Sequence, residues 1–132
     1  MQTPTSSYNV SDSIIEMAQE RLAYLRELLP HVEKTKNVSG NLRVDKCKRS
    51  FQYYIITTPG DTKGTYLPRK DIRKAKAIAQ RDYNAAAATI LKRDIAAINN
   101  FLAAFHPEEL DNAFTGLHPG RRALVVPVRE SD

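Results

Sequence analysis

The stretch LRVDKCKRSFQYYIITTPGDTKGTYLP, residues 42–68, decides the fold. Its β-branched and aromatic residues come in short runs, and turn-forming residues separate these runs, which is typical of short strands. We predict strands over residues 42–45, 51–57 and 65–67. Residues 46–49 would form the first turn, and residues 59–64 would form a glycine-containing hairpin loop. The stretch therefore predicts a three-stranded antiparallel meander.

Helical patterns lie on both sides of this predicted sheet. The first helix is expected to begin at the S-x-x-E capping box of Ser13 and Glu16 and to end before Pro30. A long helix should follow Pro68 and continue to His106-Pro107, and a short one should cover residues 107–114. In the first half of the long helix, the stripe expected to face the core is Ile72, Ala75, Ala79, Tyr83, Ala86 and Ile90. Residues 124–128 are apolar and would either cover the core or lead into a further part of the protein.

Together these elements predict an α+β fold. An N-terminal helix precedes a three-stranded antiparallel sheet, a long amphipathic helix packs across the sheet, and a short helix ends the chain. The length of 132 residues indicates a single domain over residues 11–132, with a basic sheet region at 42–81 and a flexible polar tail at 1–10. A single cysteine, Cys47, favours a reducing compartment, and no apolar run is long enough to span a membrane. We therefore expect a cytoplasmic protein.

Positive charge is concentrated in one part of the chain. Residues 34–81 contain thirteen of the twenty lysines and arginines but only three acids, which gives this window a net charge of +10 and the remainder −5. A concentrated positive field suits a polyphosphate, because neutralised phosphates release condensed counterions. Nucleic acid is therefore the expected partner, with duplex DNA favoured.

The predicted strands and hairpins place aromatic residues among these charges. In the second strand, Tyr53 shares the core face with Phe51, whereas Gln52 and Tyr54 point to the other face. Further cations crowd the start of the long helix, where the helix dipole disfavours them, which suggests that an anion docks there. The candidate nucleic-acid-binding residues are Arg43, Lys46, Lys48, Arg49, Gln52, Tyr54, Lys63, Arg69, Lys70 and Arg73.

The chain gives little indication of catalysis. Its three histidines lie far apart in the sequence, and Cys47 has no histidine near it, so neither a nucleophilic triad nor a zinc site is expected. Asp45 followed by Asp61-Thr62-Lys63 imitates a nuclease pattern of acid, then acid-x-lysine, but Asp61 is predicted to lie in a turn rather than on a rigid strand. We expect no catalytic residue, no metal ligand and no cofactor.

Two resemblances support a role at nucleic acid. The strand, strand, strand, helix order over residues 42–81 resembles the arm-type DNA-binding modules of tyrosine integrases and the Apetala-type modules of plants. The segments QYY at 52–54, KGTYLP at 63–68, AKAIAQRDY at 75–83 and RALVVPV at 122–128 are similar to the N-terminal region of an uncharacterised clostridial family. In that family the region precedes a restriction-endonuclease-like domain, so the resemblance implies a DNA-associated accessory domain and transfers no catalytic residue.

The sequence thus favours a non-enzymatic nucleic-acid-binding module that acts through a basic sheet and its hairpins. The alternative is a protein-interaction module, such as a phage-encoded anti-CRISPR or another nuclease inhibitor, whose partner would be a nuclease or its guide-RNA complex. The basic charge argues against a DNA mimic, because such mimics are acidic. The sequence leaves the oligomeric state open.

Overall fold

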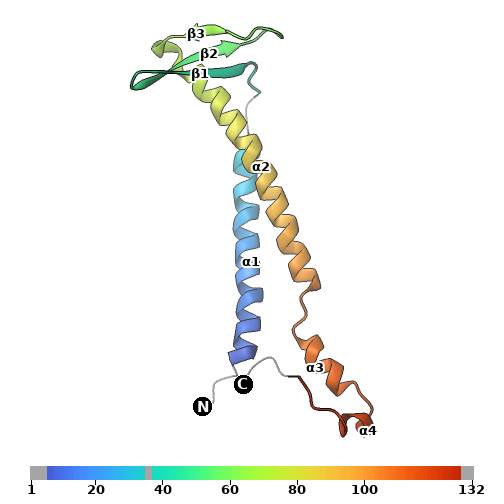
Figure 1. Cartoon of the computed structure of the whole chain (residues 1–132). Helices are drawn as coiled ribbons and strands as arrows, with labels where there is room; N and C mark the ends of the chain where they lie inside the picture. Colours follow the sequence, from blue (N-terminus) through green and yellow to red (C-terminus); the bar gives the residue numbers. More distant parts are fainter. Residues whose placement is uncertain (1–5, 35–36, 129–132) are drawn as a thin grey trace. The chain divides into compact units, whose positions relative to one another are not determined.

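The computed structural model describes residues 6–34 and 37–128 and has the expected α+β fold (Figure 1). Along the chain, α1 (Ser6–Glu33) precedes the strands β1 (Asn41–Cys47), β2 (Ser50–Ile56) and β3 (Thr65–Leu67). A 3₁₀ turn, η1 (Arg69–Asp71), leads into the long helix α2 (Ile72–Ala104). Two short helices follow, α3 (Glu108–Thr115) and α4 (Pro119–Arg122). The last of these was not expected from the sequence.

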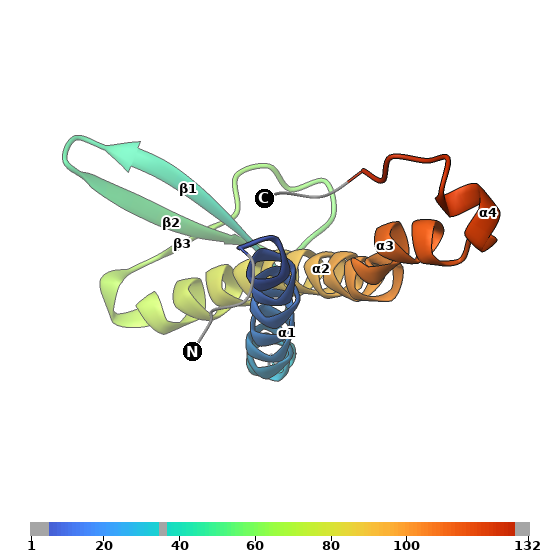
Figure 2. The same cartoon turned by 90° about the horizontal axis from the view of Figure 1, so that it is seen from below.

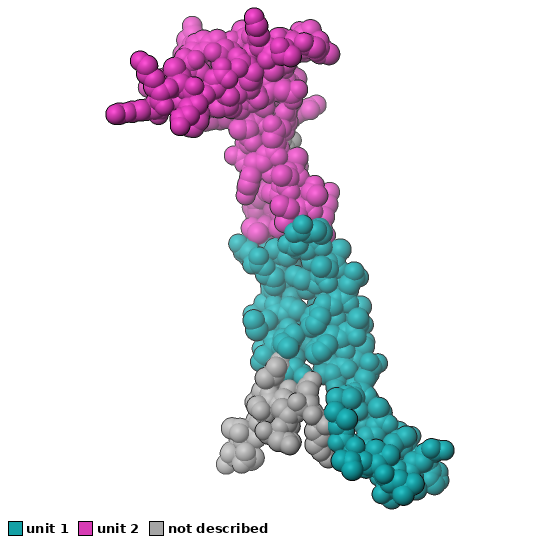
Figure 3. All heavy atoms as spheres, in the orientation of Figure 1, with its two compact units in different colours: residues 1–26, 93–132 teal, residues 27–92 magenta. Residues whose placement is uncertain are grey.

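The chain divides into two compact units (Figure 3). Unit 1 comprises residues 1–26 and 93–132, and unit 2 comprises residues 27–92. In unit 1 the Arg26 guanidinium donates to Asn99 Oδ1 over 3.3 Å, and in unit 2 Lys92 Nζ lies 3.2 Å from Glu33 Oε2. The sheet, η1 and the first part of α2 all belong to unit 2.

The sheet is the predicted antiparallel meander, with the strands in the order β1-β2-β3. The strand β3 has the expected bounds, whereas β1 and β2 extend toward each other until Cys47 pairs with Ser50. Only Lys48 and Arg49 remain in the first turn, and Lys48 takes the left-handed φ of 54°. At the second hairpin, Gly64 has a φ of 78°, and an added Cβ would lie 2.8 Å from the carbonyl oxygen of Ile55. Glycine is therefore required at that position.

The two faces of the sheet differ as the alternation predicts. Tyr53 pairs with Leu67, which is buried together with Ala75 and Ile78 of α2. This inner face packs against α2. Phe51 lies on the same face but is 57% exposed. It is near the tip of the β1–β2 hairpin, and this tip diverges from the first turns of α2 (Figure 2).

The helix α1 is longer than expected at both ends. It begins at Ser6, inside the segment 1–10 expected to be a flexible tail, of which residues 1–5 lie outside the described residues. Ser13 and Glu16 are therefore exposed residues in the helix interior rather than a capping box. Pro30 is inside α1 and not beyond its end. Its missing N–H costs one intrahelical hydrogen bond, and the helix ends within one turn after it, at Glu33. Leu22 and Leu25 of α1 are buried.

In the first half of α2, most of the residues predicted to face the core do not face it. Ala75 is buried as predicted, but the other buried side chain is Ile78, which was not in the predicted stripe. Tyr83 is 65% exposed and Ile90 is 47% exposed. These two residues lie on a second apolar stripe, and the helix turns that stripe toward solvent.

Several apolar side chains near the end of the chain are also exposed. Leu124, Val125, Val126 and Val128 are all exposed, so this segment does not cover a core within the described residues. None of the described helices combines the length and the apolar character that crossing a bilayer would require.

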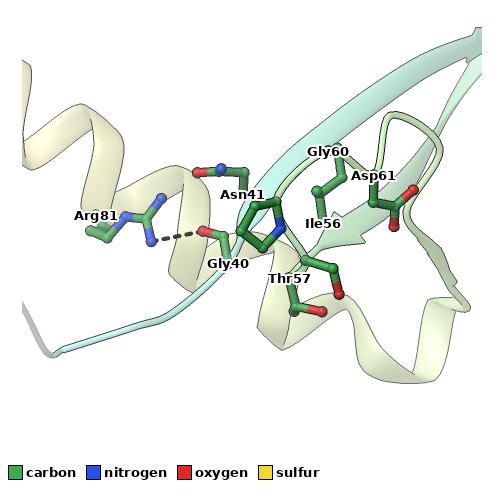
Figure 4. A pocket seen from close by; sticks show the side chains of 9 residues that line it. Gly40, Asn41, Ile56, Thr57, Gly60, Asp61 and Arg81 are labelled. Carbon is green, nitrogen blue, oxygen red and sulfur yellow. Dashed lines mark hydrogen bonds between the residues drawn. The ribbon is translucent and has the colours of Figure 1, made fainter.

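Arg81 joins α2 to the segment that leads into β1. Its Nη1 donates to the carbonyl oxygens of Val38 and Gly40 over 2.8 and 2.9 Å, and its Nη2 lies 2.8 Å from Asp82 Oδ1. Figure 4 shows the bond to Gly40. The planar guanidinium can make these bonds together because its five N–H groups have a fixed geometry.

Replacement of Arg81 by lysine is therefore expected to lower the free energy of unfolding by about 2 kcal/mol, because an ammonium cannot make all of these charge-assisted bonds. Urea unfolding of both proteins would measure the loss. The matched control is Arg73→Lys, since Arg73 is exposed and forms no ion pair with a described residue. Equal stability of Arg81→Lys and the wild type would show that the guanidinium does not hold the start of β1.

Candidate nucleic-acid interface

The tip of the β1–β2 hairpin presents two cations to solvent. Lys48 and Arg49 occupy the two turn positions, and both side chains are exposed. The hairpin requires a left-handed residue at Lys48, and an L-residue pays about 1–2 kcal/mol for this conformation. Lysine therefore stands at a turn position whose conformation favours glycine or asparagine.

Lys46 is separated from the rest of the expected sheet surface. It pairs with Phe51 and so lies on the inner face of the sheet, whereas Gln52 and Tyr54 lie on the outer face. Lys46 and Tyr54 were both predicted to bind nucleic acid as parts of one basic sheet region. The register shows that the two residues point to opposite faces of the sheet, although Lys46 remains exposed near the hairpin tip.

Arg43 lies on the outer face as expected, but its guanidinium is already bound within the protein. Nη1 lies 2.7 Å from Asp45 Oδ1, Nε donates to the carbonyl oxygen of Lys63 over 2.7 Å, and the group lies 3.9 Å from the centre of the Tyr54 ring. Asp45 neutralises the charge of Arg43 and two of its five N–H donors are used, so Arg43 attracts a phosphate less than an unpaired cation would. Arg43 therefore positions Tyr54 and the second hairpin.

The second hairpin presents Lys63 beside a carboxylate that shapes the loop. Asp61 Oδ1 accepts from the backbone N–H groups of Lys63 and Gly64 over 3.0 and 3.1 Å. These bonds, with that from Gly64 the stronger influence, hold the pKa of the Asp61 carboxyl below its ordinary value. The carboxylate thus stabilises the turn, and the Lys63 side chain is exposed beside it.

The start of α2 carries the densest group of cations. Arg69 and Lys70 lie in η1, and Arg73, Lys74 and Lys76 lie in the first turns of the helix. All five side chains are exposed, whereas Ala75 and Ile78 of the same turns are buried. The start of α2 therefore presents a dense group of cations to solvent.

Nine exposed cations of unit 2 form no ion pair with a described carboxylate. They lie at the two hairpins and at the start of α2, and they are Lys46, Lys48, Arg49, Lys63, Arg69, Lys70, Arg73, Lys74 and Lys76. By sequence, unit 2 contains fourteen lysines and arginines against six acids, a net charge of +8, whereas unit 1 has a net charge of −3. The division into units therefore follows the division of charge.

Unit 2 also has a cleft of about 630 Å³ that the sequence analysis did not anticipate. Its lining includes Gly40, Asn41, Thr57, Asp61 and Arg81 (Figure 4). Arg81 is fully engaged with Asp82 and two backbone carbonyls, and Asp61 binds its own loop. The charged groups of this cleft therefore serve the fold.

One residue missed by the sequence analysis belongs to the outer face. Tyr66 pairs with Tyr54 across β2 and β3, and the two ring centres lie 5.6 Å apart in an edge-to-face arrangement. The hydroxyl of Tyr54 donates to Gln52 Oε1 over 3.3 Å. The alternation within β3 contained the signal, because a residue that pairs with Tyr54 must share its face.

The described residues contain no cluster of three or more histidine, cysteine or acidic side chains that could hold a metal ion. Comparison of the chain with protein-family models, curated proteins and solved structures found no significant match. The argument for function therefore rests on the geometry and charge of unit 2, and the resemblances noted in the sequence stay predictions.

Proposed function

We propose that unit 2 is a non-enzymatic nucleic-acid-binding module that contacts phosphates through its two hairpins and the start of α2. The observation that carries the proposal is the set of nine exposed cations without carboxylate partners among the described residues. Leaving so many like charges together disfavours the fold, and a polyanion removes that repulsion while releasing its own counterions.

The arrangement of the acids supports a role in binding rather than in cleavage. Asp45 is paired with Arg43, and Asp61 is bound by backbone N–H groups of its loop. A metal-dependent nuclease needs carboxylates that are free to hold the metal. The two carboxylates of the nuclease-like pattern thus both have structural partners.

The first test is the salt dependence of binding to duplex DNA. Affinity is expected to fall steeply with salt, with a log–log slope of about −0.9 per neutralised phosphate. The double variant Lys48→Asn with Arg49→Gln should reduce this slope, and asparagine preserves the left-handed turn position. Fluorescence anisotropy of a labelled duplex at several salt concentrations would measure both effects.

The matched control for the hairpin is the charge-preserving double variant Lys48→Arg with Arg49→Lys, which should bind like the wild type. An absence of binding at low salt, or an affinity that does not change with salt, would contradict the proposed function. An unchanged slope in the charge-removing variant would exclude the hairpin tip from the interface.

A second candidate function is protein interaction, and the surface of α1 favours it. Ile14, Met17 and Tyr24 are large apolar residues on one side of α1, and all three are exposed. An exposed apolar stripe of this kind is typical of a surface that binds another protein. Inhibition of target cleavage by a purified CRISPR nuclease loaded with guide RNA would support this candidate if Met17→Lys abolished the inhibition and Lys48→Asn did not.

A further inference from the structure

The outer face of the sheet carries a row of three residues, one from each strand. Arg43 pairs with Tyr54, and Tyr54 pairs with Tyr66. Strand pairing sets neighbouring side chains of such a row about 4.5–5.5 Å apart at Cβ, so the three side chains form a continuous surface. This surface is made of π-systems, because the guanidinium stacks on one ring and the second ring touches the first.

The central residue of the row is fixed in place. Arg43 covers one face of the Tyr54 ring, the Tyr54 hydroxyl donates to Gln52, and the ring meets Tyr66 in an edge-to-face contact. Arg43 is in turn held by Asp45 and by the carbonyl oxygen of Lys63. Tyr54 and Arg43 therefore form a rigid support, and Asp45 adds no net charge to the face because Arg43 neutralises it.

Tyr66 is the part of the row that is open to a ligand. It is 50% exposed, and its ring contact within the described residues is the one with Tyr54. Half of the Tyr66 side chain is therefore open to solvent beside the edge-to-face contact. An exposed tyrosine on a rigid support, held on a strand, is suited to stacking against a flat ring.

Cations lie on either side of this aromatic row along the strand direction. Lys48 and Arg49 lie at the hairpin tip, and Lys63 lies in the loop whose backbone binds Arg43. Arg49 lies five residues before Tyr54, about 17 Å at the rise of an antiparallel strand. The surface thus offers phosphate contacts on either side of a stacking site.

The face of a base is available only in a single strand, because a duplex stacks its bases and presents their edges. We infer that the ligand of this face is single-stranded nucleic acid, with one base stacked on Tyr66 and the flanking phosphates near Lys48, Arg49 and Lys63. The inference rests on the proposed function and makes it more specific. It changes the favoured ligand from the duplex DNA indicated by charge to a single strand.

The test compares oligonucleotides of equal length, oligo-dT, oligo-rU and a duplex, by anisotropy with the full chain. The variant Tyr66→Val removes the ring but keeps a strong strand former, and it should weaken binding of the single strands roughly ten-fold. Binding of the duplex should change by less than about two-fold, since Tyr66 does not contact phosphates in this scheme. Tyr66→Phe should bind like the wild type, because the ring is kept.

Two further measurements control for folding. Tyr83→Leu removes another exposed tyrosine of unit 2, one on α2 that is 65% exposed, and should leave all affinities unchanged. The chain has six tyrosines and no tryptophan, so a base stacked on Tyr66 should quench the intrinsic tyrosine emission of the wild type. This readout needs no variant, and it remains available if Tyr66→Val does not fold.

The outcomes separate this inference from the function on which it rests. Equal losses of single-strand and duplex affinity in Tyr66→Val, or no loss in either, would overturn stacking on Tyr66. Salt-dependent nucleic-acid binding by the wild type would then still support the proposed function. An absence of binding to all three oligonucleotides at low salt would overturn both. Similar affinities for oligo-dT and oligo-rU would show that the sheet does not select the sugar.

Discussion

Replacing Ile78 with alanine is expected to lower the free energy of unfolding by about 3 kcal/mol. Ile78 is 1% exposed and shares the small core of unit 2 with Leu67 and Ala75. The substitution removes three carbon atoms from a site where few neighbouring side chains can move in to fill the cavity. Because a domain of this size is marginally stable, the loss would be a large part of the total stability. Urea unfolding followed by far-UV circular dichroism would measure it.

The matched control is Ile90→Ala in the same helix. Ile90 is 47% exposed, so the same chemical change there should cost under about 1 kcal/mol. The sequence analysis placed Ile90 on the inner stripe of α2 and left Ile78 out of it. A larger loss at Ile90 than at Ile78 would show that the stripe predicted from the sequence, rather than the one seen in the structure, faces the core.

Ile78 and Ile90 show why the residues of α2 that face the core were predicted only in part. The first half of the helix has apolar residues on two neighbouring stripes, one through Ala75 and Ile78 and one through Tyr83 and Ile90. Helical periodicity detects both stripes. The larger side chains favour the stripe through Tyr83 and Ile90, which is the one that faces solvent. Which stripe is buried depends on where η1 and Pro68 direct the chain, and this is a tertiary effect.

The ends of α1 show the limits of local signals in a similar way. A serine three residues before a glutamate favours a helix start, but it does not prevent a helix from beginning earlier, and α1 begins seven residues before Ser13. Pro30 is compatible with a helix that ends within one turn of it. Signals of this kind constrain where a helix can end but do not determine its length.

The sheet was predicted well because turns and alternation act together. The glycine-containing loop determines the register of β2 against β3, and this register determines the face of every residue. The candidate site was predicted less well. Sequence alone could identify Arg43 as a cation, but the engagement of its guanidinium by Asp45, Lys63 and Tyr54 depends on side-chain geometry. Tyr66 was missed because the strand that carries it is only three residues long.

The cations at the start of α2 lead to the prediction with the largest expected effect on binding. Neutralising Arg73, Lys74 and Lys76 together with glutamine should lower nucleic-acid affinity on the order of a hundred-fold at moderate salt, if each contacts one phosphate. The log–log salt slope should become less steep by about 2.7. Glutamine is a good helix former and cannot bind phosphate as an ion, so α2 should remain intact.

This triple variant should bind nucleic acid less tightly but be slightly more stable than the wild type. Cations at the N-terminal end of a helix oppose its dipole, so their removal should raise the melting temperature of the free protein slightly. A variant that is more stable but binds far less tightly is what we expect if these charges are kept for a ligand. Thermal unfolding without nucleic acid and anisotropy with it would measure the two changes on the same samples.

The control for net charge removes three cations from unit 1, through Arg21→Gln, Arg93→Gln and Arg121→Gln. Both triple variants lose the same charge from the whole chain, but only the first loses it from the exposed cluster on α2. If the two variants lose affinity equally, binding responds to the overall charge and the cluster has no special position. If the α2 variant keeps the wild-type salt dependence while the hairpin variant does not, the hairpins contact the nucleic acid and the start of α2 does not. The salt dependence of affinity could instead become less steep in the α2 variant and in the hairpin variant Lys48→Asn with Arg49→Gln, but not in the unit 1 variant. Both surfaces would then contact the same ligand.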